Sequence, residues 1–121
     1  MNANEETIER YFTAWKNQSL SELPQIFSSD ARYIVHPFKL EEYVGLEAIT
    51  QYWKDNPVAK QIKPEPYIIT KLVSGDISFL EWGCDYQNLA GEQKQMQGMM
   101  ILEFANGLIK ELREHFETQK I

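Results

Sequence analysis

Two titratable side chains stand where they could take up and release a proton near neutral pH. His36 ends the apolar stretch ARYIVHP (residues 31–37), and a histidine titrates close to neutrality. Glu114 alternates with Leu112 and Phe116 in LIKELREHFE (residues 108–117), which puts a carboxylate on the apolar face of a predicted strand. Burial there would raise the pKa of the carboxyl group towards the working range of a general acid or base. One interpretation of both residues is therefore an acid–base site.

Each residue also has a purely structural interpretation. His36 can be a buried imidazole bonded to the backbone beside Pro37, and alternation alone does not show whether its face points inward. Glu114 can reach solvent or pair with a lysine where its strand twists near the end. If the two side chains meet, the carboxylate would orient the imidazole and raise its pKa. The sequence leaves open whether they share one cavity.

The rest of the chain must supply the elements that position these groups. Helical spacing of apolar residues predicts helices over residues 4–17, 21–29 and 45–53, with a first strand over 31–37. The proline-rich stretch 55–66 predicts a loop. Four more strands follow, over 67–73, 77–87, 92–104 and 108–117, joined by glycine-containing turns of hairpin length. The fold class is therefore α+β, in the order ααβαββββ, with a curved antiparallel sheet wrapped over three helices.

Alternation divides the later strands into two faces. The inward face is predicted to be aromatic and methionine-rich: Ser78, Leu80, Trp82, Cys84, Tyr86, Met96, Gly98, Met100, Leu102, Phe104, Leu108, Lys110, Leu112, Glu114 and Phe116. The outward face interleaves charged residues with an apolar set: Ile77, Phe79, Met99, Ile101 and Ile109. Such a stripe on an open sheet face predicts a homodimer packed through the sheet. His115 falls on this outer face and is assigned to the interface or the surface.

Composition limits the class of protein. A chain of 121 residues is long enough for one domain, spanning residues 1–121. The net charge of -6 and the lack of a basic run argue against nucleic-acid binding. No apolar stretch approaches the ~20 residues of a membrane span, and the N-terminus lacks a signal core. Cys84 is the single cysteine and no Cys/His cluster has zinc spacing, so we expect a cytoplasmic protein without metal or cofactor, in which Cys84 is an inert core thiol.

Four phrases resemble members of the nuclear transport factor 2-like superfamily, in particular its SnoaL-like and ketosteroid-isomerase-like branch. They are ERYFTAWKNQSLSEL, FSSDARYIVHP, YVGLEAITQYW and ILEFANGLIKELREHFE, and together they span nearly the whole chain. The resemblance implies a single SnoaL-like domain shaped as a cone, with a pocket between the curled sheet and the helices. It also implies dimerisation through the outer sheet face. Because the fold serves binding and assembly roles as well as catalysis, it does not settle the function.

The resemblance assigns roles to three positions. The tyrosine that ketosteroid isomerases carry in the first helix matches Tyr11, and their Asp-Pro base matches His36-Pro37. Their third group falls on Met100, which cannot donate a hydrogen bond, so steroid isomerase activity is disfavoured. The acid/base aspartate of SnoaL-like cyclases, in the last strand, matches Glu114. The Arg-x-Asp pair of limonene-type epoxide hydrolases has no match, so that chemistry is disfavoured too.

These observations predict a pocket for an apolar or aromatic small molecule. The expected lining residues are Trp15, Trp53, Trp82, Tyr86, Met100, Leu112 and Phe116. An enzyme with this pocket would move a proton next to a carbonyl, as an isomerase or cyclase, with His36 or Glu114 as base and Tyr11 stabilising the enolate oxygen. The alternative is a non-catalytic dimeric module that only binds the ligand. An open cavity that holds the acid–base groups would favour the enzyme, and a cone filled by aromatic side chains would exclude it.

Overall fold

The computed structural model describes residues 2–35 and 41–121, so His36 lies outside the described residues. The described elements are α1 (Ala3–Asn17), the 3-10 helix η1 (Leu20–Gln25), β1 (Phe27–Val35), β2 (Glu41–Val44), α2 (Leu46–Trp53), the π-helical turn η2 (Lys54–Val58), β3 (Ile62–Ser74), β4 (Ile77–Gln87), β5 (Gln93–Ala105) and β6 (Leu108–Lys120).

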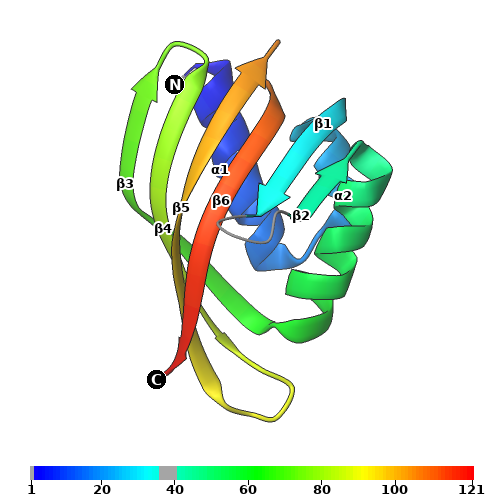
Figure 1. Ribbon diagram of the computed structural model, residues 1–121. Helices are drawn as coiled ribbons and strands as arrows, with labels where there is room; N and C mark the ends of the chain where they lie inside the picture. The colour runs from blue at the N-terminus through cyan, green and yellow to red at the C-terminus, as the bar shows by residue number, and fades with distance from the viewer. Residues whose placement is uncertain (1, 36–40) are drawn as a thin grey trace.

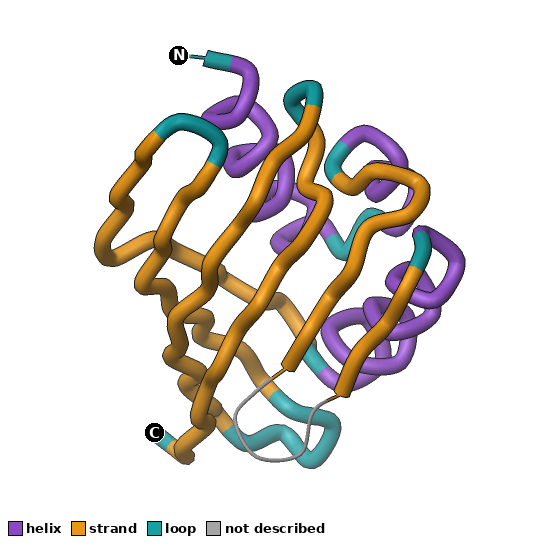
Figure 2. The backbone as a smooth tube through the Cα atoms, turned by 45° about the horizontal axis from the view of Figure 1, so that its top comes forward, coloured by secondary structure: helices purple, strands orange, loops and turns teal. Residues whose placement is uncertain are grey.

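All six strands form one curved sheet in the order β2-β1-β6-β5-β4-β3. Strands β3 to β6 form the predicted antiparallel meander, whereas β1 runs parallel to β6 and antiparallel to β2. The helices lie on one side of the sheet (Figures 1 and 2). The predicted α+β fold class and the cone shape of the curved sheet are confirmed, and the sheet is not closed.

Several local predictions differ from the structure. The second predicted helix is only the six-residue 3-10 helix η1, which contains Pro24. The short strand β2 was not predicted, because its four residues carry no alternating apolar pattern. Strand β3 begins at Ile62, inside the stretch predicted as a loop, although Pro64 and Pro66 follow. Because β3 is an edge strand, a proline without an N–H need not remove a ladder hydrogen bond from it.

The helices bury aromatic side chains against the sheet. In α1 the residues spaced at helical intervals, Ile8, Tyr11, Phe12 and Trp15, are all buried. The helix is capped by Asn2, whose side chain accepts a 2.9 Å hydrogen bond from the Glu5 N–H. In α2 the buried residues are Ile49 and Trp53. The cone is thus walled by α1 and α2 on one side and by the sheet on the other.

The predicted inward faces of β4 and β5 are confirmed, but the start of β6 is corrected. Phe104 pairs with Ile109 and Glu103 pairs with Glu111, so Lys110 is an extra residue that forms a bulge. Because of this bulge, the residues of β6 before Lys110 face the side of the sheet opposite to the one that simple alternation predicted. Ile109, expected outside, is therefore fully buried, and Lys110, expected inside, is exposed.

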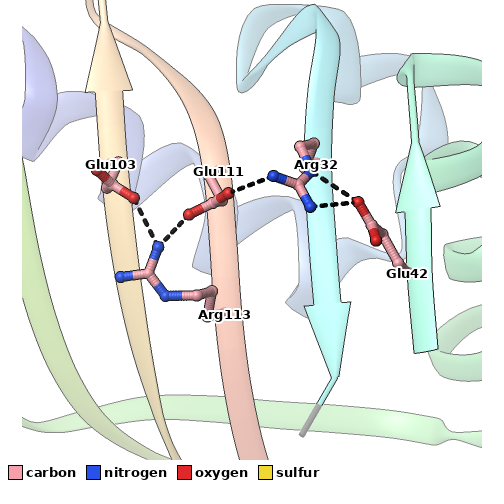
Figure 3. Close-up of polar contacts among 5 residues, drawn as sticks. All are labelled: Arg32, Glu42, Glu103, Glu111 and Arg113. Atoms are coloured by element: carbon pink, nitrogen blue, oxygen red, sulfur yellow. Dashed lines mark hydrogen bonds and ion pairs between the residues drawn. The ribbon is translucent and has the colours of Figure 1, made fainter. Parts of the chain in front are cut away.

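The outer face of the sheet combines exposed apolar side chains with a chain of charges. Ile77 is 50% exposed and Met99 52%. Beside them, charged residues of four strands alternate in sign, in the order Glu103, Arg113, Glu111, Arg32 and Glu42 (Figure 3). Arg113 lies 2.6 Å from Glu103, and Arg32 lies 2.6 Å from Glu42 and 3.3 Å from Glu111.

Candidate functional site

A cavity of about 210 Å³ lies inside the cone, between the helices and the sheet. Five predicted ligand-binding residues line it: Trp15, Trp53, Trp82, Tyr86 and Phe116. The predicted catalytic residues Tyr11 and Glu114 also line it. The aromatic side chains therefore enclose a space and do not fill the cone.

The carboxyl group of Glu114 is buried in the wall of this cavity. Glu114 is only 5% exposed, and its Oε2 accepts a 2.7 Å hydrogen bond from the hydroxyl of Tyr33. The hydroxyl of Tyr11 lies 3.4 Å from that of Tyr33. Side chains from β6, β1 and α1 thus form a chain of three polar groups, Glu114, Tyr33 and Tyr11, which we call the Glu114 chain.

The parallel pairing of β1 with β6 brings the Glu114 chain together. Tyr33 is the partner of Leu112 in the ladder, and Val35 is the partner of Glu114. Residues two positions apart on a strand share a face, so Tyr33 and Glu114 are diagonal neighbours on the inner face. Val35 immediately precedes His36 in the sequence, and because His36 lies outside the described residues, the pairing of His36 with Glu114 stays a prediction.

Burial determines the electrostatics of Glu114. Desolvation raises the pKa of its carboxyl group to about 7, and the hydrogen bond from Tyr33 opposes this rise. None of the ion pairs in the described parts of the chain includes Glu114. Near neutral pH the group is therefore divided between its acid and base forms, as general acid–base catalysis requires.

The two tyrosines of the Glu114 chain, Tyr11 and Tyr33, remain protonated. Burial raises the pKa of Tyr11 and of Tyr33 well above the ordinary value, and the nearby charge of Glu114 raises both further. Each hydroxyl can therefore donate one hydrogen bond over the physiological pH range.

The cavity walls are held by packing and by one buried amide. The rings of Tyr11 and Trp53 lie 5.3 Å apart, as do those of Trp15 and Trp82, in edge-to-face arrangements. The indole N–H of Trp15 donates a 2.8 Å hydrogen bond to Oε1 of Gln61, which is buried. These contacts fix the walls of the cavity.

Two predicted ligand-binding residues do not line the cavity. Met100 and Leu112 are 1% and 0% exposed and belong to the hydrophobic core. Met100 nevertheless lies directly opposite Glu114 in the β5–β6 ladder. Cross-strand neighbours on one face are close, so this thioether is an apolar neighbour that helps to bury the carboxyl group.

Sequence reasoning missed two lining tyrosines, Tyr33 and Tyr52. Tyr33 shares a face with Ala31, and both are buried, but only the pairing of β1 could show which face is inner. Tyr52 precedes Trp53 in α2 and lies beside the predicted apolar face of that helix. Lys60 and Asn56, which also line the cavity, come from the stretch around η2 that was predicted only as a loop.

Other kinds of site have less support. Cys84 is buried, and desolvation raises the pKa of its thiol to about 12, which fits an inert core cysteine. Within residues 2–35 and 41–121, no group of three or more His, Cys, Asp or Glu side chains is placed to hold a metal ion. No helix in those same ranges has the length and apolar character needed to cross a membrane.

Comparison with known proteins agrees with this fold. A family model described as a SnoaL-like domain matches residues 8–112. No curated protein matches the chain.

Solved structures with the same architecture have low sequence identity. A proposed isomerase from Bacillus subtilis superposes with a TM-score of 0.82 at 20% identity, covering 97% of this chain and 90% of that one. A proposed SnoaL-like polyketide cyclase from Jannaschia sp. CCS1 has a TM-score of 0.79 at 16% identity, covering 95% and 85%. An LEH-like epoxide hydrolase from M. tuberculosis has a TM-score of 0.77 at 16% identity, covering 95% of this chain and 82% of that one. These structures share the fold, and the family match over most of the chain shows that this protein belongs to the SnoaL-like domain family of the nuclear transport factor 2-like superfamily.

Proposed function

We propose that this protein binds a small apolar or aromatic carbonyl compound and catalyses cofactor-free proton transfer next to the carbonyl, with Glu114 as the acid–base group. The observation that carries the proposal is a buried carboxyl group on the wall of an aromatic cavity, with its pKa raised to about 7. A base with a pKa near the working pH is ionised in part and still strong enough to accept a proton from carbon.

The reaction would use both protonation states of Glu114. The ionised carboxylate accepts a proton from the carbon next to the carbonyl, and the electrons of that C–H bond form an enolate. The protonated carboxyl group can exchange its proton with water and return one to the same carbon, which gives hydrogen exchange. Where the enolate is conjugated with a C=C bond, the proton can instead go to the far carbon, which gives isomerisation. Glu114 returns one proton for the one that it accepts and the charge of the enolate is then lost, so the reaction needs no cofactor. The negative charge on the enolate oxygen requires a hydrogen-bond donor from the protein.

The rival function is a binding module without catalysis. It is favoured by one observation: Glu114 is only 5% exposed and its carboxylate already accepts the hydrogen bond from Tyr33, which holds it in the cavity wall. The two functions share the ligand class and differ in whether the carboxyl group reaches a C–H bond of the ligand.

Acetophenone is a suitable minimal ligand, because it is a small aromatic ketone with acidic methyl protons. In D₂O, the wild-type protein should accelerate exchange of these protons, followed by NMR, with a pH dependence that has its midpoint near the Glu114 pKa of about 7. Glu114→Gln keeps an acceptor for Tyr33 and removes the base, so exchange should fall to the uncatalysed rate. Glu117→Gln, an exposed neighbour on the same strand, should leave the rate unchanged. Binding of the ketone without exchange would support the rival function.

We also infer that the protein forms a homodimer through the outer sheet face. Ile77 and Met99 are half exposed there, beside the charges of alternating sign. In a two-fold arrangement both copies present this same face, and because it carries charges of both signs it can complement itself. As Cys84 is the single cysteine, a reducing compartment is suitable, and we propose the cytoplasm.

A further inference from the structure

The hydroxyl protons of Tyr11 and Tyr33 are already donated in hydrogen bonds within the Glu114 chain. When Glu114 is ionised it can only accept, so Tyr33 must donate its single proton to the carboxylate. The contact between the two tyrosine hydroxyls then requires Tyr11 to donate to Tyr33. In the base form of the site, neither hydroxyl has a proton left for a ligand oxygen.

Tyr52 differs from both of these tyrosines. It lines the same cavity from α2, and none of the hydrogen bonds described for residues 2–35 and 41–121 involves its hydroxyl. Its ring packs between those of Tyr33, 5.0 Å away, and Tyr43, 4.5 Å away. Its backbone carbonyl accepts a 2.8 Å hydrogen bond from the Asn56 side chain. The side chain is therefore positioned by packing while its hydroxyl proton is unused.

The charge of Glu114 also acts on the Tyr52 hydroxyl. Burial raises the pKa of Tyr52, and the charge of Glu114 is the next cause. The hydroxyl is therefore protonated whenever Glu114 is ionised. It lies near enough to Glu114 to be affected by the charge, although it makes no hydrogen bond to it.

Three other donors in the walls are less suitable. The indole nitrogens of Trp53 and Trp82 also lack partners, but both are fully enclosed by protein atoms. Tyr52 is only partly buried, which leaves part of its side chain accessible. Tyr86 is more remote from the acid–base group, because the charge of Glu114 is a cause of the raised pKa of Tyr52 but not of the raised pKa of Tyr86.

We propose that Tyr52, and not Tyr11, donates the hydrogen bond that binds the carbonyl oxygen of the ligand. This inference rests on the proposed function for the ligand class, but it concerns binding and can be tested without turnover. Tyr11 then has a positioning role, because its hydroxyl supports Tyr33 at the carboxylate. The site would combine a base from β6 with an oxygen-binding donor from α2.

The test uses acetophenone labelled with ¹³C at the carbonyl, whose stretching frequency falls when the oxygen accepts a hydrogen bond. The infrared band of the ketone bound to wild-type protein should lie below its position in an apolar solvent. In Tyr52→Phe the band should return to the apolar position, and the ketone should bind roughly three- to tenfold more weakly, as expected for one lost neutral hydrogen bond. Tyr11→Phe and Tyr43→Phe should keep the shifted band. Tyr43 is a matched control, because its ring packs on Tyr52 while its hydroxyl bonds Glu41.

The outcomes separate this inference from the proposed function. A shifted band that disappears only in Tyr52→Phe supports the inference even if methyl exchange is never catalysed. A shift that survives in Tyr52→Phe, or disappears in Tyr11→Phe alone, overturns it. Absence of saturable binding of the ketone to the wild-type protein also overturns it. Thermal unfolding of each variant shows whether a lost band reflects a lost fold, and Tyr52→Leu provides a second removal of the hydroxyl.

Discussion

The hydroxyl of Tyr33 donates a 2.7 Å hydrogen bond to the carboxylate of Glu114, from a strand 81 residues earlier in the chain. This bond opposes the effect of burial, because it stabilises the ionised form of a group that desolvation drives towards the neutral form. The balance places the pKa near neutrality. Tyr33 is thus the residue through which the fold adjusts the acid–base group.

Removing the Tyr33 hydroxyl should raise the pKa of Glu114 above its value of about 7. In Tyr33→Phe the ring and its packing remain, but the stabilising donor to the carboxylate is lost. The change can be measured by NMR titration of ¹³C-labelled glutamate side chains. Tyr86→Phe, which changes another cavity tyrosine, should leave the pKa of Glu114 unchanged. A lower pKa in Tyr33→Phe would contradict the assignment of the hydrogen bond.

Glu114 should make the protein less stable as the pH rises from about 4.5 to about 7. Its pKa in the folded state, about 7, lies above the ordinary glutamate pKa of 4.5, so between these pH values the folded state holds a proton that the unfolded state has released. The stabilising effect of this proton is complete below pH 4.5 and is lost as pH passes through 7. At about 1.4 kcal/mol per pKa unit, the loss amounts to roughly 3 kcal/mol.

The measurement is urea unfolding of wild type and Glu114→Gln at pH 5 and pH 8. The variant lacks the titrating group and so does not lose this stability as the pH rises. The free energy of unfolding of the variant minus that of wild type should therefore be larger at pH 8 than at pH 5. Glu117→Gln, at an exposed position, should follow the wild type at both pH values. Parallel curves for wild type and Glu114→Gln would show that the carboxyl group is not buried as described.

Gly98→Ala should destabilise the fold and narrow the cavity. A methyl group there would clash with the backbone oxygen of His115 and lie 2.8 Å from the Trp82 ring. The backbone cannot yield locally without disturbing the β5–β6 ladder, so we expect a loss of roughly 1–3 kcal/mol in the free energy of unfolding. Thermal and urea unfolding measure it. Gln97→Ala, at the exposed neighbouring position, should have a much smaller effect.

A charge on the apolar outer face should dissociate the proposed dimer. Met99→Glu places a carboxylate where Met99 is 52% exposed, and two such charges would approach each other across a two-fold interface. Light scattering after size-exclusion chromatography should show a dimer for the wild type and a monomer for the variant. Leu89→Glu, in the β4–β5 turn where Leu89 is 73% exposed, should remain dimeric. A monomeric wild type would refute the interface.

Several errors in the predicted fold have one physical origin. Alternation is local, so a single bulge at Lys110 was enough to turn Ile109 inward against expectation. The strand β2 and the start of β3 depend on pairing with neighbours that lie elsewhere in the sequence. Met100 and Leu112 were expected on the cavity wall because they face inward, but facing inward does not distinguish a core position from a lining position.

The amino-acid sequence by itself determined the α+β class, the meander of β3 to β6 and the inward carboxyl group of Glu114, because hydrophobic periodicity and turn residues act locally. Its phrases also indicated the SnoaL-like family. Only the tertiary structure decided that β1 pairs in parallel with β6, which brings Tyr33 to Glu114 and leaves the Tyr52 hydroxyl unused. Such contacts join strands and helices distant in sequence, and their geometry depends on register and packing that no local pattern contains.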